Sequence, residues 1–291
     1  MLINDKSLMN ERSNTVEASE TKAECFSLLI SIYKQESAEY LDLCLQSIIE
    51  QTLKPTEIIL VLDGIIGDNL EKVIGHFSES LNINTVGYDE NKGLSFALNL
   101  GLKQCCYELV ARIDADDICL PYRFEKQIDF MKTHSNVDIC GSYAQNIDEK
   151  GSEKLLRVVP TAPSEIKRLI WSCPIIHPSV MFKKSKILAI GNYDINTPYR
   201  QEDYELWIRA VRAGLTIVNL DEPLIKYRIY NRSKNNLKVA CNRFKIGLSA
   251  VKEFDDSFIA YLSLFFPIVR LMLPRKVIVW LNKKYDPRAV K

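Results

Sequence analysis

Three carboxylates follow an apolar stretch in the middle of the chain and could hold a metal ion. The stretch begins at Leu109 and leads into Asp114, Asp116 and Asp117. If it is a strand, alternation places Asp114 and Asp116 on the same side. Two neighbouring carboxylates repel, which raises the pKa of one unless a cation neutralises them. Mg²⁺ suits such oxygen ligands and often binds substrate phosphates as well. A strand that ends in a solvated acidic turn explains the same residues equally well.

A fourth carboxylate, Asp203, is a candidate general base. It lies at the predicted start of a helix, within the segment Gln201-Glu202-Asp203-Tyr204. Acidic residues are favoured there for structural reasons, because they cap the helix and complement its dipole. In the functional interpretation, Asp203 removes a proton from an acceptor hydroxyl while a metal-bound phosphate leaves.

Several other polar residues have both a functional and a structural explanation. Arg123 and Arg228 are suitable partners for diphosphate oxygens, but surface arginines would look the same. His177 stands before Pro178, where a histidine with ordinary loop hydrogen bonds is common. The segment 91–93, Asn-Lys-Gly, predicts a turn, and its backbone could also lie against a nucleotide.

The first half of the chain alternates predicted strands and helices. The strands are expected at 26–32, 57–62, 82–87 and from 109, with helices at 39–51, 70–77 and 94–103. This alternation predicts an α/β fold with a doubly wound sheet and a parallel core. Ligands of such sheets bind at the carboxyl ends of strands. Ser31, Tyr33, Asp63 and the aspartate group all lie at predicted strand ends, so we expect them to converge on one edge.

The second half is expected to continue the same domain. Helices are predicted at 121–132 and 201–213, and strands at 137–140, 155–159, 180–183, 215–220 and 224–228. No linker separates these elements, so one domain is expected over 25–235. Residues 1–24 are polar and of mixed charge, which predicts a disordered leader rather than a signal peptide. Residues 236–291 are predicted to form a helical, basic tail.

The composition excludes some classes of protein. The 291 residues carry a net charge of +1, whereas a dedicated nucleic-acid binder has a strong basic excess. Eight cysteines are present, but none has the Cys-x-x-Cys spacing of a zinc or redox site. Reduced, packed thiols in a cytoplasmic protein are therefore expected.

A series of segments in this order resembles the inverting glycosyltransferases of family 2, which have the GT-A fold. The resemblance extends over roughly residues 26–232. It consists of the strand at 26–33, the segment 57–64, Asn91-Lys92-Gly93-Leu94, the Asp114–Asp117 motif with Pro121 and Arg123, and Glu202-Asp203 before Leu206-Trp207. Each segment alone is weak, but their order and compatible spacing make the match specific.

The resemblance implies roles for the nucleotide and the reaction. Ser31, Tyr33 and Asp63 would hold the uracil and ribose of a UDP-sugar, with Lys92 and Arg123 as further nucleotide-sugar contacts. Asp114 would contact the nucleotide, and Asp116 would ligate Mn²⁺ or Mg²⁺ across the diphosphate. Asp203 would be the catalytic base. Asp117 is expected to be structural.

Contacts to the acceptor or diphosphate are implied for Glu202, His177 and Arg228. Many family members carry a histidine shortly after the late Tyr-Arg pair. Here Tyr227-Arg228 is followed by Ile229-Tyr230-Asn231, so no histidine-dependent role is transferred to that place.

The finer resemblance is to bacterial O-antigen and exopolysaccharide enzymes that add glucose or galactose to N-acetylglucosamine (GlcNAc) on undecaprenyl diphosphate, through a β1,3 linkage. It implies a peripheral protein on the cytoplasmic face of the inner membrane. The apolar segment 258–273 is too short to span a bilayer, and basic residues follow it. An interfacial helix on an anionic leaflet fits this composition, and so does a helix that packs on the domain.

Other classes fit less well. A haloacid-dehalogenase-like phosphatase would place its Asp-x-Asp motif near the chain start, not at residue 114. A sugar-nucleotide nucleotidyltransferase would have a glycine-rich basic loop after the first strand, whereas Ser31 to Gln35 reads Ser-Ile-Tyr-Lys-Gln. A non-catalytic sugar-nucleotide-binding protein is expected to lose Asp116 or Asp203, and both are present.

Overall fold

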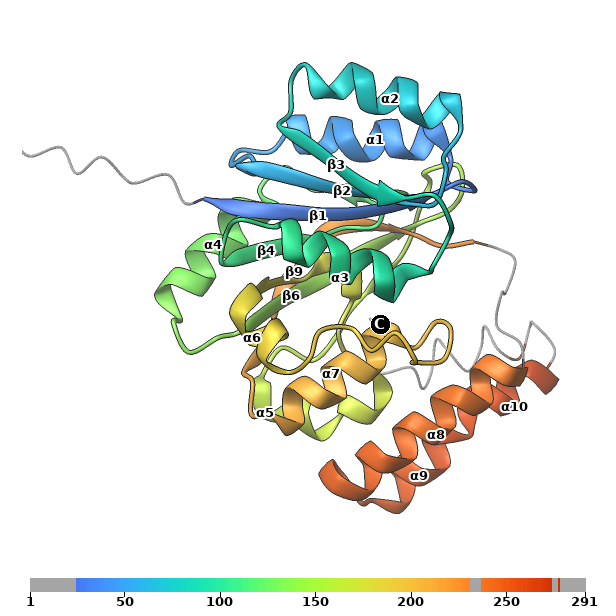
Figure 1. Cartoon of the computed structure of the whole chain (residues 1–291). Coiled ribbons are helices and arrows are strands. Elements are labelled where there is room, and N and C mark those ends of the chain that lie inside the picture. Colours follow the sequence, from blue (N-terminus) through green and yellow to red (C-terminus); the bar gives the residue numbers. More distant parts are fainter. Residues whose placement is uncertain (1–24, 231–236, 274–276, 278–291) are drawn as a thin grey trace, which may run out of the picture.

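The fold is built around one mixed sheet with helices on both faces (Figure 1). The structure is a computed structural model, and it describes residues 25–230, 237–273 and 277. The expected leader at 1–24 and the end of the expected tail lie outside the described residues. The sheet has nine strands in the order β3-β2-β1-β4-β8-β6-β9-β5, with β7 paired to β6.

The first half of the sheet is parallel, as the alternation of strands and helices predicts. Its strands are β3 (Ile83–Tyr88), β2 (Glu57–Asp63), β1 (Phe26–Tyr33) and β4 (Leu109–Arg112). The helices between them are α1 (Ala38–Ile49), α2 (Asp68–Ser78) and α3 (Leu94–Gln104). Carboxyl ends of parallel strands share an edge, so this half brings the ends of β1, β2 and β4 together.

Alternate residues of the central strands supply two cores. Leu28, Ile30 and Ile32 of β1 pack with α1, α2 and α4 (Arg123–Thr133). Leu29 points the other way and packs with α3 and with α7 (Glu202–Arg212). Figure 1 shows α1 and α2 on one side of the sheet and α3 and α7 on the other. At Gly101 a Cβ would lie 2.2 Å from Leu29 Cδ1, so glycine allows α3 to approach the sheet closely.

The second half of the sheet mixes directions. β8 (Met181–Lys183) is antiparallel to β4 and to β6 (Ile139–Ile147), and β6 runs parallel to β9 (Ile217–Arg228). The strands expected at 215–220 and 224–228 form the single strand β9. The register of β6 and β9 shifts on both sides of Tyr143, which pairs with Pro223. The break expected between two strands is therefore an irregularity within the single strand β9.

Short elements complete the domain. They are β5 (Ile118–Cys119), β7 (Glu153–Arg157), α5 (Pro163–Arg168), α6 (Lys184–Ala189) and two single 3₁₀ turns, η1 (Ile170–Ser172) and η2 (His177–Ser179). β5 pairs with β9 in antiparallel fashion, which ties the segment after the aspartates to the far side of the sheet.

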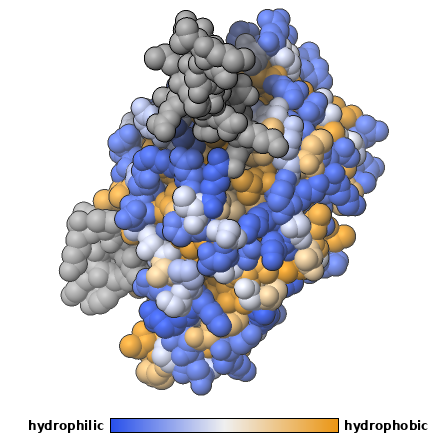
Figure 2. Space-filling view, turned by 90° about the vertical axis from the view of Figure 1, so that its left-hand side faces the viewer, coloured by the Kyte–Doolittle hydropathy of each residue, from blue (hydrophilic) through white to orange (hydrophobic). Residues whose placement is uncertain are grey.

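Three helices follow the sheet. α8 (Leu237–Phe254) packs on η1, and α9 (Phe258–Leu264) and α10 (Phe266–Met272) pack on α8 (Figure 1). None of the helices in the described part of the chain combines the length and hydrophobicity that crossing a bilayer requires. The face of the molecule in Figure 2 shows apolar residues in groups between hydrophilic ones.

Candidate active site

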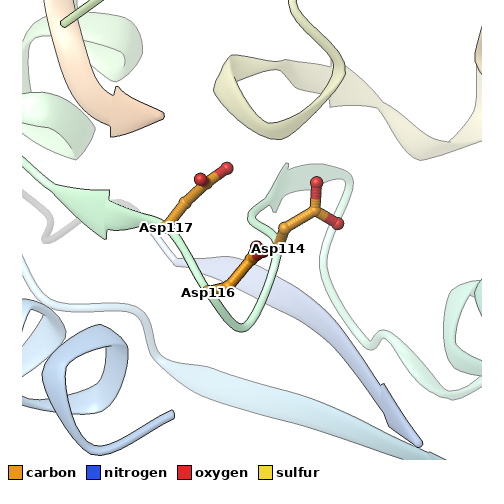
Figure 3. Close-up of side chains that lie close together, drawn as sticks. All are labelled: Asp114, Asp116 and Asp117. Atoms are coloured by element: carbon orange, nitrogen blue, oxygen red, sulfur yellow. The ribbon is translucent and has the colours of Figure 1, made fainter. Parts of the chain in front are cut away.

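The three aspartates lie in a turn between β4 and β5 (Figure 3). β4 ends at Arg112, and the turn is closed by the Asp117 N–H, which donates to the Asp114 carbonyl at 3.1 Å. Asp114 and Asp116 therefore lie in a turn and not in a strand, so the expectation that strand alternation aligns them is wrong. The turn itself brings one oxygen of each of the three carboxylates within 4.8 Å of the others.

The electrostatics of this turn fit a divalent cation. Burial, and then the charge of Asp114, raises the pKa of Asp116. Burial raises the pKa of Asp117 well above its usual range, and Asp114 and Asp116 add to the effect. Asp117 is 1% exposed, and its Oδ2 is buried with no partner among the described residues. Clustered carboxylates with an unpaired oxygen are the ligands that Mg²⁺ or Mn²⁺ would take.

Arg112 is a site residue that the sequence reasoning missed. Its side chain is 2% exposed and forms an ion pair with Asp114. Its Nε and Nη1 are buried without partners in the described part of the chain. The available signal was a charged residue inside an otherwise apolar strand, because an arginine is rarely buried unless it is paired. Arg112 places a buried positive charge beside the aspartate turn.

The end of β9 binds the aspartate turn from the other side. The Arg228 N–H donates to Asp117 Oδ1 at 2.8 Å, and its Nε donates to the Asp116 carbonyl at 2.8 Å. The Arg228 guanidinium lies 4.0 Å from the centroid of the Tyr40 ring. Tyr230, which the sequence reasoning did not select, donates its hydroxyl to Asp116 Oδ2 at 2.6 Å. Arg228 therefore holds the aspartate turn, and its expected contact with the acceptor or diphosphate stays a prediction.

Asp63 organises the loop that carries Lys92. It is 5% exposed, and its Oδ1 accepts bonds from the Tyr88 hydroxyl at 2.8 Å and the Lys92 N–H at 2.7 Å. Its Oδ2 accepts from Asn91 Nδ2 at 2.9 Å and the Gly93 N–H at 3.1 Å. Both oxygens of Asp63 thus already serve the loop, and any contact with a nucleotide must share them.

The Lys92 side chain of the same loop lies over two aromatic rings. Its Nζ is 5.2 Å from the Tyr88 ring centroid and 4.9 Å from that of Phe96, within the range of a cation–π contact. Gly93 has φ +89°, a backbone conformation that favours glycine. This conformation allows the consecutive N–H groups of Lys92 and Gly93 to point at the one carboxylate.

Ser31 and Tyr33 lie at the carboxyl end of β1, both half-buried. Tyr33 pairs in register with Asp63 of β2. Burial raises the pKa of the Tyr33 hydroxyl, and the charges of Glu36, Tyr199 and Asp116 raise it further. β1 pairs with β4 up to Leu29↔Arg112, so the end of β1 lies next to the strand that leads into the aspartate turn.

Asp203 lies in the first turn of α7 and is half-buried. Its Oδ1 accepts the Tyr204 N–H at 2.8 Å, and its Oδ2 lies 3.9 Å from the Cys173 thiol. Burial raises the pKa of Asp203, while Arg243 and then Arg112 lower it. Arg112, which pairs with Asp114, is thus one of the charges that lower the pKa of Asp203. The role of Asp203 as the base stays a prediction.

Glu202, beside Asp203, is also half-buried. Its Oε1 accepts the Arg200 N–H at 3.1 Å, and burial raises the pKa of its carboxyl group. This bond fixes the backbone just before α7. The expected contact of Glu202 with an acceptor stays a prediction.

Arg123 and His177 lie in the core instead of lining the site. Arg123 is 0% exposed, and its Nη2 donates to the Arg112 carbonyl at 2.6 Å. This hydrogen bond holds the last residue of β4. His177 is buried, with its Nε2 2.8 Å from the Tyr193 hydroxyl and its ring edge against Trp207. Burial lowers the pKa of His177 well below its usual value, so the ring is neutral. Neither placement fits the expected direct contact with a nucleotide or acceptor.

The fold is of the GT-A glycosyltransferase class. The structure superposes on S. aureus TarS, residues 1–349, in complex with UDP, with a TM-score of 0.65, 17% identity, and coverage of 89% of this chain and 78% of that one. A TarS structure in complex with UDP-GlcNAc gives a TM-score of 0.64. The longer TarS chain is covered over only 46% of its length.

The sequence identifies the family within this class. The model of "Glycosyl transferase family 2" matches residues 27–191, and the chain belongs to this family. It is 40% identical over 204 residues to the amylovoran biosynthesis glycosyltransferase AmsE of Erwinia amylovora, covering 70% of this chain and 76% of AmsE. It is 34% identical to the UDP-Gal:alpha-D-GlcNAc-diphosphoundecaprenol beta-1,3-galactosyltransferase of Escherichia coli, covering 76% of this chain and 81% of that enzyme.

Proposed function

We propose that the protein transfers a hexose, glucose or galactose, from a UDP-sugar to a GlcNAc acceptor linked to undecaprenyl diphosphate. The linkage formed is β1,3, and the product serves surface polysaccharide (O-antigen) synthesis. The observation that best supports the proposal is the turn of three clustered carboxylates after β4 in a chain of glycosyltransferase family 2, with Asp203 half-buried in the first turn of α7. The named relatives that assemble polysaccharides support the choice of substrates.

In the proposed reaction the groups of this chain position and deprotonate the acceptor. Asp203 takes the proton of the acceptor hydroxyl, and the resulting oxygen attacks the anomeric carbon. The bond from that carbon to the diphosphate breaks, UDP leaves with the electron pair, and the configuration inverts. Holding both substrates in line supplies much of the rate enhancement.

Asp116, with Asp114 and Asp117 beside it, would hold Mn²⁺ or Mg²⁺. When bound, the ion supplies positive charge to the leaving diphosphate. Ser31, Tyr33, Asp63 and the Lys92 loop would surround the nucleotide at the ends of β1 and β2.

A donor panel tests the substrates. Purified protein with Mn²⁺ is incubated with lipid-linked GlcNAc diphosphate and, in turn, UDP-glucose, UDP-galactose and their N-acetyl forms. Transfer from one of the two hexose donors supports the proposal. Transfer only from an N-acetylated donor contradicts the proposed donor, and formation of a nucleotide sugar from a sugar phosphate would indicate a nucleotidyltransferase instead.

The pH dependence of transfer should report Asp203. A base must be ionised, and burial raises the pKa of Asp203 above the usual Asp value of 3.8. Activity is therefore retained at neutral pH and lost as pH falls through a midpoint above that value. The measurement is kcat/KM against pH at saturating metal, which reports groups of the free enzyme. A rate that stays constant down to about pH 4 would contradict the raised pKa.

We also propose that the protein binds the cytoplasmic face of the inner membrane through α9. Ala260 and Leu264 of α9 are buried against α8, whereas Phe258, Ile259 and Leu262 on its other side are 76%, 75% and 55% exposed. A helix that is apolar all round is normally covered on both sides. Residues 274–291 carry six Lys or Arg and one Asp, which favours an anionic bilayer as the cover.

Charged substitutions on α9 should weaken membrane binding. We expect Phe258→Asp with Ile259→Asp to lower sedimentation with phosphatidylglycerol vesicles, because two exposed apolar side chains are lost. Leu155→Asp is the matched control, since Leu155 is also exposed (54%) but lies on β7. Equal sedimentation of the double variant and the wild-type protein would contradict this docking face, and so would equal binding to neutral vesicles.

A further inference from the structure

Arg228 and Tyr230, at and just after the end of β9, hold the aspartate turn. Arg228 donates its backbone N–H to Asp117 and its side-chain Nε to the Asp116 carbonyl, and the Tyr230 hydroxyl donates to the Asp116 carboxylate. Alternate residues of an extended chain point the same way, so one strand end presents both groups to the turn. Between them, the Ile229 N–H donates to the Ile147 carbonyl at 2.8 Å and anchors this end to β6.

We propose that Tyr230 is a positioning residue for the metal ligand Asp116. Its hydroxyl binds Oδ2 at 2.6 Å and holds the carboxylate in place, so that Asp116 would offer its other oxygen, Oδ1, as the ligand of a metal ion. The inference rests on the metal site proposed above. Carboxylates that ligate metals are commonly held by such outer hydrogen bonds, and their loss typically weakens metal affinity by about 10- to 100-fold.

The chemistry and surroundings of Tyr230 suit this role. A phenol is a neutral donor at neutral pH, and a hydrogen bond to a carboxylate is of the strong, charge-assisted kind. The residue is 45% exposed, so the described fold depends little on its ring. Strand pairing brings Tyr230 to the turn. β5, which follows the turn, pairs with β9 at Ile118↔Lys226 and Cys119↔Ile225, and Tyr230 follows β9.

The neighbouring carboxylates of Asp116 explain why such a donor is useful. Asp116 lies beside Asp114 and Asp117, and three carboxylates left alone would turn away from one another. A donor fixed to one oxygen keeps the carboxylate in place before the ion arrives. Asp116 would therefore be ordered before it holds a metal ion, which lowers the cost of binding.

The test is Tyr230→Phe, which removes one oxygen and keeps the ring. We expect the Kd for Mn²⁺, measured from the free-ion electron paramagnetic resonance signal, to rise about 10- to 100-fold. At saturating Mn²⁺ the kcat of the variant should return to the wild-type value. Tyr261→Phe is the matched control, because its hydroxyl also binds a carboxylate, Asp256 Oδ1 at 2.8 Å, but on α9; its Mn²⁺ affinity should not change.

The outcomes separate the two proposals. If the wild-type protein binds Mn²⁺ and Asp116→Ala does not, an unchanged or tighter Kd in Tyr230→Phe overturns the role of Tyr230 alone. A loss of kcat that saturating Mn²⁺ does not restore, together with a lower Tm, also overturns it, because the residue is then merely structural. If the wild-type protein binds no Mn²⁺, the metal site fails and the role of Tyr230 fails with it.

Discussion

Asp203→Asn should lower kcat for sugar transfer by about 10²- to 10⁴-fold, the usual contribution of a general base. The amide has the size of the carboxylate and can still accept the Tyr204 N–H, so the start of α7 is retained. It cannot take the acceptor proton, however. UDP affinity should stay at the wild-type value, because the nucleotide is expected at the ends of β1 and β2. The measurements are kcat from released UDP and the Kd for UDP by calorimetry.

The matched control for this prediction is Glu205→Gln, a carboxylate-to-amide change in the same helical turn. Glu205 pairs with Arg209 on α7 at 2.6 Å and has no place in the proposed reaction. Its transfer rate should remain close to that of the wild-type protein. Near-normal kcat in Asp203→Asn would show that another group is the base. Loss of UDP binding in that variant would show that the residue serves the nucleotide instead.

Asp116→Ala should abolish the part of UDP binding that depends on Mn²⁺. The substitution removes the carboxylate that the end of β9 holds in place and leaves Asp114 tied to Arg112. Its effect should exceed the about 10- to 100-fold typical of outer-shell changes. The measurement is UDP affinity with Mn²⁺ and with a chelator. For Asp116→Ala the two values should coincide, whereas for the wild-type protein they should differ.

Asp129→Ala controls for the loss of one negative charge. Asp129 is exposed on α4, and its side chain takes no part in the site. Its UDP affinity should respond to Mn²⁺ like that of the wild-type protein. If Asp116→Ala also keeps the full response to Mn²⁺, the aspartate turn is not the metal site.

Much of the fold was predictable because the pattern of apolar residues along the sequence matches the residues that are buried in the structure. The runs at β1 and β2 are apolar on both faces, as strands with helices on both sides must be. α7 ends at Arg212, shortly before Gly214, whose φ of +78° suits the residue that stops a helix. These signals lie within a few residues of one another, so the sequence alone carries them.

The details of the site were less predictable because they depend on contacts between distant segments. Tyr230 and Arg228 reach the aspartate turn across more than a hundred residues, through the pairing of β5 with β9. The pattern of the chain at 118–119 is too short to predict that strand. The sequence also could not reveal that Arg123 is buried against the end of β4. An arginine that is buried in the core and one that binds phosphate look the same in a sequence.

The placement of Asp63 shows a similar limit. Its position at the end of β2 was predictable, whereas its expected contact with the nucleotide stays a prediction. The four groups that bind its two oxygens come from the loop at 88–93, whose conformation the sequence does not specify. Asp63 therefore acts on the site first by fixing this loop.

The central claim is that the protein transfers a sugar with inversion, using Asp203 as the base. The most direct measurement is the anomeric configuration of the product, determined by NMR after transfer from an α-linked UDP-hexose. We expect a β linkage to the 3-hydroxyl of GlcNAc, formed by the wild-type protein and lost in Asp203→Asn. An α-linked product would contradict it.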